Sequence, residues 1–187
     1  MGSGNGSNFQ AIVEYIRERN LAVRVVAMIT DNPRAHIIER ARNLGVDATT
    51  LDYRGIGNKA LYNQMLLETL TRLEPDLVAL AGYMRIVPPE IVRAFSGRMI
   101  NIHPALLPSF PGLDAIKQAW DHGVKVTGVT VHYIDERVDT GPIIDQAPVI
   151  VEPADTLETL EEKIHRLEHE LYPRVIERIL LGGKGNI

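Results

Sequence analysis

Apolar residues along the chain alternate between short runs rich in β-branched side chains and longer stretches with helical spacing. The short runs predict strands at 22–29, 48–51, 77–81, 99–102, 126–134 and 143–151. The longer stretches predict helices at 9–16, 37–44, 59–73, 89–95, 113–122 and from 155 or 156 to about 181. Glycine, which commonly ends helices, follows three of them, as Gly45, Gly123 and the pair Gly182 and Gly183. This alternation is typical of an α/β domain with a largely parallel sheet.

Length and composition indicate one globular domain. The 187 residues are 45% hydrophobic and 24% charged, and no repeat or linker divides them, so we expect a single domain over 1–187. A net charge of -4 argues against a nucleic-acid partner. The lack of cysteine excludes disulfides and thiolate chemistry, and no apolar run reaches the ~20 residues that cross a bilayer. With no secretory signal in view, we expect a cytoplasmic protein without a membrane partner.

Asn101 and His103 are the first candidates for chemistry. They are two positions apart on a predicted strand, so both side chains are expected on one face near its carboxyl end, where open α/β sheets bind ligands. An amide donor beside an imidazole can stabilise an oxyanion and manage a proton in acyl transfer. The alternative is that His103 only anchors the proline-rich loop at 104–111. The composition and position of that loop also suggest a gate over the site.

Asp139 is a third candidate. It stands in the turn sequence Val138-Asp139-Thr140-Gly141-Pro142 between two predicted strands, and a turn aspartate needs no catalytic role. If folding brings Asp139 near His103, its carboxylate favours and orients the imidazolium.

The glycine-rich opening, Gly2 to Asn8, leads into the first predicted helix. Backbone N–H groups in such a segment can hold a phosphate. The spacing is not that of the dinucleotide fingerprint, so we do not expect NAD. A Met-Gly-Ser start is also typical of an expression linker, which would carry no function.

The last predicted helix contains His165-Arg166-Leu167-Glu168-His169, which matches the inverted zincin pattern HxxEH. That pattern places two histidine ligands of a catalytic zinc on one helix face. A third ligand is needed, and Glu177 would lie ~12 Å from His169 along the helix axis. Zinc peptidase chemistry therefore stands as a rival interpretation that needs a ligand from earlier in the chain.

Several segments together resemble the phosphoribosylglycinamide formyltransferase family, over residues 3 to about 173. They are Ser3-Gly4-Asn5-Gly6-Ser7-Asn8, Leu80-Ala81-Gly82-Tyr83-Met84-Arg85-Ile86, Asn101-Ile102-His103-Pro104-Ala105-Leu106-Leu107-Pro108, and Thr130-Val131-His132-Tyr133 through Asp139-Thr140-Gly141-Pro142. The Asn-x-His-Pro segment and the later aspartate are common to the wider folate formyltransferase superfamily, so they specify the chemistry more securely than the acceptor.

The resemblance implies a three-layer, Rossmann-like formyltransferase fold with a phosphate-binding half at about 1–98 and a folate-binding, catalytic half at about 99–187. It implies a catalytic set of Asn101, His103 and Asp139. The residues that it implies for the phosphate and ribose of the acceptor are Gly6, Ser7, Asn8 and Glu168. Those that it implies for the folate are Met84, Arg85, Ile86, Val87, Asp135, Glu136, Arg137 and Val138.

The implied reaction is formyl transfer from 10-formyltetrahydrofolate to the amine of glycinamide ribonucleotide in purine synthesis, in a monomer or homodimer and without a metal. The acceptor amine attacks the formyl carbon, Asn101 and protonated His103 stabilise the oxyanion, and Asp139 holds the imidazolium charged. Family members carry a short apolar strand before the glycine-rich loop, and we expect that strand to be missing here. Methionyl-tRNA formyltransferase, formyltetrahydrofolate hydrolase and a non-catalytic binding module of the same fold remain alternatives.

Overall fold

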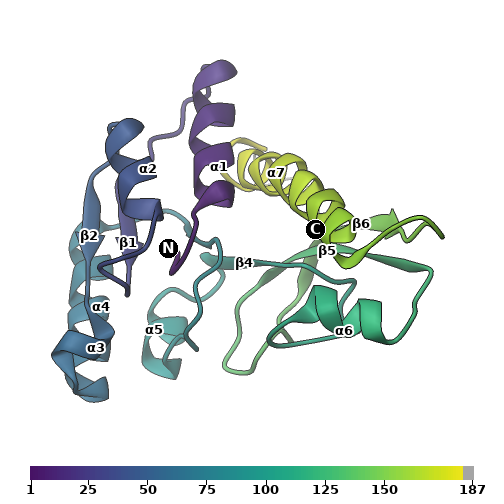
Figure 1. The fold of residues 1–187 in the computed structure, drawn as a ribbon. Helices are drawn as coiled ribbons and strands as arrows, with labels where there is room; N and C mark the ends of the chain where they lie inside the picture. The colour runs from purple at the N-terminus through teal and green to yellow at the C-terminus, as the bar shows by residue number, and fades with distance from the viewer. Residues whose placement is uncertain (183–187) are drawn as a thin grey trace.

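The computed structural model describes residues 1–182, and they form an α/β fold with helices on both faces of the strands (Figure 1). The strands are β1 (Met28–Thr30), β2 (Ala48–Thr50), β3 (Val78–Leu80), β4 (Met99–His103), β5 (Val126–Tyr133) and β6 (Ile143–Ile150). The helices are α1 (Ser7–Glu18), α2 (Ile37–Asn43), α3 (Tyr53–Ile56), α4 (Lys59–Leu73), α5 (Pro89–Ala94), α6 (Ala115–Asp121) and α7 (Leu157–Leu181). The predicted fold class is confirmed. Among these residues no helix has both the length and the apolar character to cross a membrane.

The strands form two sheets. β1 and β2 pair in parallel, and β3, β4, β5 and β6 follow one another in a second sheet, where β3 and β4 are parallel and the last two pairings are antiparallel. The backbone at 1–3 lies between them: Gly2 N–H donates to Ile29 O at 3.0 Å, and Ala81 N–H donates to Met1 O at 2.8 Å. Among the described residues α1 is the first element. The β3–β4 pairing joins the two halves predicted at about 1–98 and 99–187. That the two halves form a single domain stays a prediction.

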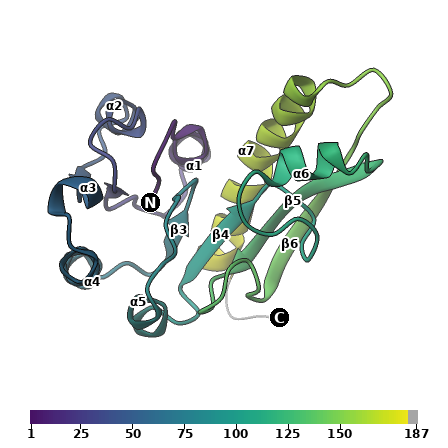
Figure 2. The same ribbon diagram turned by 60° about the horizontal axis from the view of Figure 1, so that its bottom comes forward.

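Two apolar cores fix which way the β4 side chains point. Ile100 and Ile102 pack with α1, β5 and α7, whereas Met99 packs with α4, α5 and β3. Figure 2 shows α7 running alongside β4, β5 and β6, away from α3 and α4. Because side chains alternate along a strand, Asn101 and His103 share the Met99 face and not the α7 face. The amphipathic pattern of β4 therefore delivers both polar groups to one side of the sheet.

Local chemistry explains where the observed elements differ from the prediction. The segment predicted as a strand at 22–29 is a strand only at its end, because β1 pairs with β2 over three residues and the residues before it pair with no strand. The predicted helix 113–122 is shorter, because Asp114 has a left-handed φ of 54°. Helix α3 was not predicted; Asp52 caps it by accepting from Arg54 N–H and Gly55 N–H. Gly183 lies outside the described residues.

The start of α7 follows the sequence closely. Thr156 is its N-cap, and its hydroxyl accepts from Thr159 N–H while the Thr159 hydroxyl accepts from Thr156 N–H. This reciprocal pair satisfies two donors that a helix start leaves open. Gly182 caps the other end.

Candidate active site

His103 ends β4 and is almost fully buried, at 4% exposure. Its Nε2 lies 2.8 Å from the carbonyl oxygen of Phe110, in the proline-rich loop. A carbonyl only accepts, so the proton on this side of the ring belongs to Nε2, and Nδ1 is left facing the site. The histidine does anchor the loop, as the structural alternative expected, but only one of its two nitrogens is used for this.

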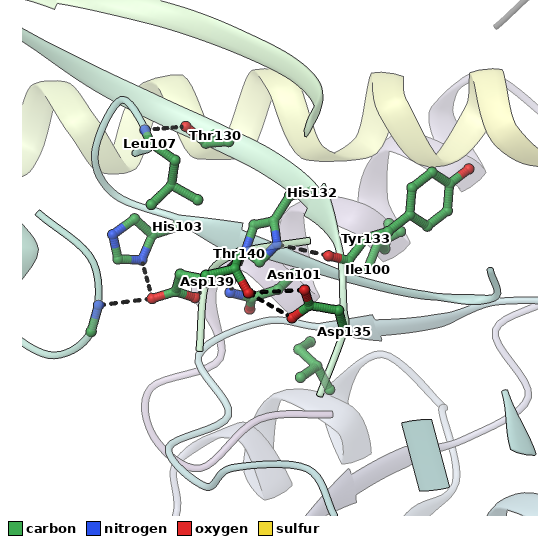
Figure 3. Close-up of polar contacts among 12 residues, drawn as sticks. Ile100, Asn101, His103, Leu107, Thr130, His132, Tyr133, Asp135, Asp139 and Thr140 are labelled. Carbon is green, nitrogen blue, oxygen red and sulfur yellow. Dashed lines mark hydrogen bonds and ion pairs between the residues drawn. The ribbon is translucent and has the colours of Figure 1, made fainter. Parts of the chain in front are cut away.

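Asp139 meets His103 across the site. Its Oδ2 lies 3.4 Å from Nδ1 of the imidazole (Figure 3). The backbone of Asp139 has φ 53°, a left-handed conformation that few residues other than glycine adopt and that clusters at functional positions. Gly141 lets the turn approach β5, because a Cβ there would lie 1.8 Å from Tyr133 O. The turn sequence thus places the carboxylate where the catalytic interpretation requires it.

His132 is a member of this cluster that the sequence reasoning assigned no role. It pairs with Asn101 across the β4–β5 ladder, so the two side chains lie on one face (Figure 3). Its Nε2 lies 3.3 Å from Asn101 Nδ2 and 3.6 Å from Asp139 Oδ1. Nδ1 lies 2.9 Å from Tyr133 O, which fixes the ring. The register that brings His132 opposite Asn101 is visible only in the structure.

The environment keeps Asp139 ionised. Burial tends to raise the pKa of its carboxyl group, but the contact with His132, the hydrogen bond from Gly112 N–H and the charges of His103 and His132 outweigh burial. The pKa of Asp139 is consequently held below its ordinary value.

Thr130 fixes the loop that passes over the site. Its fully buried hydroxyl donates to Ala105 O at 2.7 Å and accepts from Leu107 N–H at 3.0 Å. The amide of Gln146, on β6, donates to the same oxygen at 2.9 Å. One strand hydroxyl therefore holds both sides of the turn that follows His103.

The glycine-rich segment forms the start of α1. Gly6 is the N-cap, with φ 81° and no side-chain cap, and Ser7 and Asn8 open the helix. The N–H groups of a helix's first turn have no acceptor within the helix, and its dipole attracts anions. No acidic side chain lies in that first turn. Free N–H groups at this helix start can hold an anion, and the phosphate role of the segment stays a prediction.

Glu168 connects α7 to this segment. The residue is 4% exposed; Oε2 accepts from Asn8 Nδ2 at 3.0 Å and lies 3.0 Å from His165 Nδ1. This hydrogen bond, acting against burial, raises the pKa of His165, and burial lowers the pKa of His169. Within residues 1–182, no three His, Asp or Glu side chains are grouped as metal ligands. Glu168, the glutamate of the HxxEH pattern, instead contacts Asn8 of the candidate phosphate segment.

The first segment assigned to the folate has a mixed character. Met84 and Ile86 are 66% and 75% exposed, whereas Val87 is buried. The guanidinium of Arg85 forms an ion pair of 2.6 Å with the buried Asp31. The structure therefore shows two apolar side chains available for a ligand and one arginine already engaged, and the folate role of all of them stays a prediction.

The second such segment, the loop at 135–138, is folded on its own side chains. Asp135 accepts from the Thr140 hydroxyl at 2.8 Å and from Arg137 N–H at 3.0 Å. Glu136 forms an ion pair of 3.0 Å with Arg93 of α5, the helix that follows the first folate segment. Val138 is exposed. The ion pair joins this loop to α5, and the folate role of the loop stays a prediction.

Comparisons with known proteins identify the family of this chain. The family described as formyl transferase matches residues 1–176. The phosphoribosylglycinamide formyltransferase of Bacillus subtilis (strain 168) is 48% identical, over 95% of this chain and 91% of that protein. The crystal structure of phosphoribosylglycinamide formyltransferase from Bacillus halodurans has a TM-score of 0.93 and 45% identity, covering 98% of this chain and 94% of the other. The trifunctional purine biosynthetic protein adenosine-3 of Bos taurus is 38% identical, but this chain spans only 18% of it. The chain belongs to the formyl transferase family.

Proposed function

We propose that the protein transfers the formyl group of 10-formyltetrahydrofolate to the amine of 5'-phosphoribosylglycinamide in purine biosynthesis. The observation that carries the proposal is the convergence of Asn101, His103 and Asp139 from two distant parts of the chain. Family membership and the names of the similar proteins support the same reaction. Neither a metal nor a covalent enzyme intermediate is needed for direct attack of an amine on a formyl carbon.

Asn101 and His103 supply the donors for the oxyanion. The Asn101 amide carries two N–H groups and lies beside His132, whose Nε2 is 3.3 Å from Nδ2, so an N–H of Asn101 can donate to the substrate. In the imidazolium form, Nε2–H of His103 donates to Phe110 O and Nδ1–H faces the reaction centre. Donors fixed in this way stabilise the negative charge that develops on the formyl oxygen.

Asp139 maintains the charge of that imidazolium and handles the proton. Its lowered pKa keeps it ionised at neutral pH, next to Nδ1. As the amine attacks, it must lose a proton, and the departing folate nitrogen must gain one. Asp139 is the carboxylate at the reaction centre, so it can accept the proton of the amine and pass it to the departing folate nitrogen, directly or through an ordered water.

The acceptor's phosphate binds at Gly6, Ser7 and Asn8, where the start of α1 offers free N–H groups. Its ribose hydroxyls donate to Glu168. The amide oxygen Oδ1 of Asn8 is buried and has no hydrogen-bond partner among residues 1–182, so it can accept from a ribose hydroxyl. The folate lies against Met84, Arg85, Ile86 and Val87 and under the 135–138 loop.

The direct test follows release of the deformylated folate from 10-formyltetrahydrofolate, with and without glycinamide ribonucleotide. The proposal expects release only with the acceptor, together with a formylated ribonucleotide in equal amount. Release at the same rate without the acceptor would instead identify a hydrolase. No release in either mixture would contradict the enzymatic assignment.

A further inference from the structure

We infer that Arg40, on α2, is a positioning residue for the acceptor's phosphate, an inference that rests on the proposed function. Its guanidinium donates from Nε to Asn5 O at 2.9 Å and from Nη2 to Asn5 Oδ1 at 2.7 Å. Nη1 donates to Gln10 Oε1. One side chain thus grips the glycine-rich segment and the first turn of α1 together, and all three acceptors are neutral.

These hydrogen bonds of Arg40 determine where the backbone N–H donors of the segment point. In a trans peptide the C=O of one residue and the N–H of the next are coplanar and point in opposite directions. Arg40 holds Asn5 C=O on the α2 side, so Gly6 N–H is directed away from α2. Ile37 N–H holds Gly4 C=O in the same way at 3.1 Å, which directs Asn5 N–H. Two successive N–H groups are therefore aimed by α2.

These donors are the ones that an anion would use. Gln10 is the first residue of this region whose N–H bonds back into α1, to Gly6 O at 3.0 Å. The N–H groups just before it are not used by the helix. Without Arg40, the Asn5–Gly6 peptide is free to rotate, because glycine at Gly6 has few steric limits. The guanidinium also brings a positive charge close to the site, and the three acceptors that it contacts do not neutralise it.

A purely structural brace between α1 and α2 is the competing explanation. Arg17 provides the matched control, because it joins the same two helices by donating to Leu44 O, at the opposite end of α2. If Arg40 were only a brace, Arg40→Met and Arg17→Met would have similar effects. A positioning role predicts that only Arg40→Met acts on the phosphate.

The test measures calorimetric binding of glycinamide ribonucleotide, without folate, to the wild type, Arg40→Met, Arg40→Lys and Arg17→Met. We expect Arg40→Met to raise Kd about tenfold, since charge-assisted hydrogen bonds fix the loop. Arg40→Lys keeps the charge but not the forked geometry, so its Kd should fall between those of the wild type and Arg40→Met. Arg17→Met binds as the wild type does.

Turnover supplies the second readout. Arg40→Met should lower kcat/KM for glycinamide ribonucleotide but not for glycinamide riboside, which lacks the phosphate. The KM for 10-formyltetrahydrofolate should not change. Equal Kd values for wild type and Arg40→Met, or an equal loss with both acceptors, would overturn the inference. A wild type that binds the ribonucleotide but transfers no formyl group would contradict the proposed function alone, and the Kd comparison would still decide on Arg40.

Discussion

Oδ2 of Asp139 accepts a hydrogen bond of 2.8 Å from the backbone N–H of Gly112. This bond joins the turn that carries the carboxylate to the loop that His103 anchors through Phe110. Both loops are therefore held in place before any substrate arrives. The arrangement separates two properties of Asp139 that substitution can test: its position, which the backbone fixes, and its charge.

Asp139→Asn keeps the shape of the side chain and removes the charge. We expect kcat to fall by about two to four orders of magnitude, because the amide neither sustains the imidazolium of His103 nor accepts a proton. Binding of glycinamide ribonucleotide should be largely retained, because its phosphate and ribose bind elsewhere. Steady-state turnover and calorimetry measure the two quantities separately.

Asp145→Asn is the control for this substitution. Asp145, on β6, forms an ion pair of 2.9 Å with Arg178, on α7. Neither residue belongs to the candidate active site. Loss of this ion pair should leave kcat unchanged. Wild-type kcat in Asp139→Asn would remove Asp139 from the mechanism.

Thr130→Val tests the hydroxyl that fixes the loop after His103. The substitution preserves shape but leaves the buried Leu107 N–H, Ala105 O and the Gln146 amide without this partner. We expect the free energy of unfolding to fall by about 3 kcal/mol, measured by urea denaturation. kcat should also fall, since the loop positions the imidazole.

Thr127, on the same strand, gives a matched comparison. It is also buried, but its hydroxyl has no hydrogen-bond partner among residues 1–182. Thr127→Val should therefore leave stability unchanged or increase it. Equal losses in both variants would show that the strand simply disfavours valine at these positions.

The sequence predicted most elements of this fold, and the reasons for success and failure are local. Asn101 and His103 were placed on one face by strand alternation alone. The left-handed turn that aims Asp139 and the register that brings His132 to Asn101 depend on contacts between distant segments, which one sequence does not display. The prediction of a strand at 22–29 was wrong for most of its length, because apolar side chains alone do not supply a neighbouring strand for the backbone to pair with. The resemblance assigned Arg85 to the folate, whereas its ion pair with Asp31, which is distant in the sequence, is visible only in the structure.

The pair of Glu168 and His165 predicts a pH effect. The hydrogen bond from His165 to Glu168 raises the pKa of His165 above its ordinary value of 6.5. Protonated His165 therefore stabilises the fold fully below pH 6.5, and this contribution is lost as pH rises through the raised pKa. Histidine NMR titration should give a pKa above 6.5 in the wild type and a lower one in Glu168→Gln. Glu170→Gln, on the same helix, should leave the His165 titration unchanged, and an unchanged titration in Glu168→Gln would rule out this cause.

Gly6 and Gly4 offer the sharpest comparison in the phosphate segment. A Cβ at Gly6 would lie 2.5 Å from Ile37 Cγ1, a side chain that is fully buried and cannot yield, and φ is 81°. Gly6→Ala should cost about 2 kcal/mol or more in unfolding free energy and raise KM for glycinamide ribonucleotide, because the left-handed strain shifts the donors. At Gly4 a Cβ would meet no atom within 4 Å, so Gly4→Ala should change stability by less than about 0.5 kcal/mol. Urea denaturation and steady-state kinetics of both variants measure these effects. If Gly6→Ala were as stable and as active as Gly4→Ala, the segment would be adaptable, and the fixed orientation of its N–H groups could not explain phosphate binding.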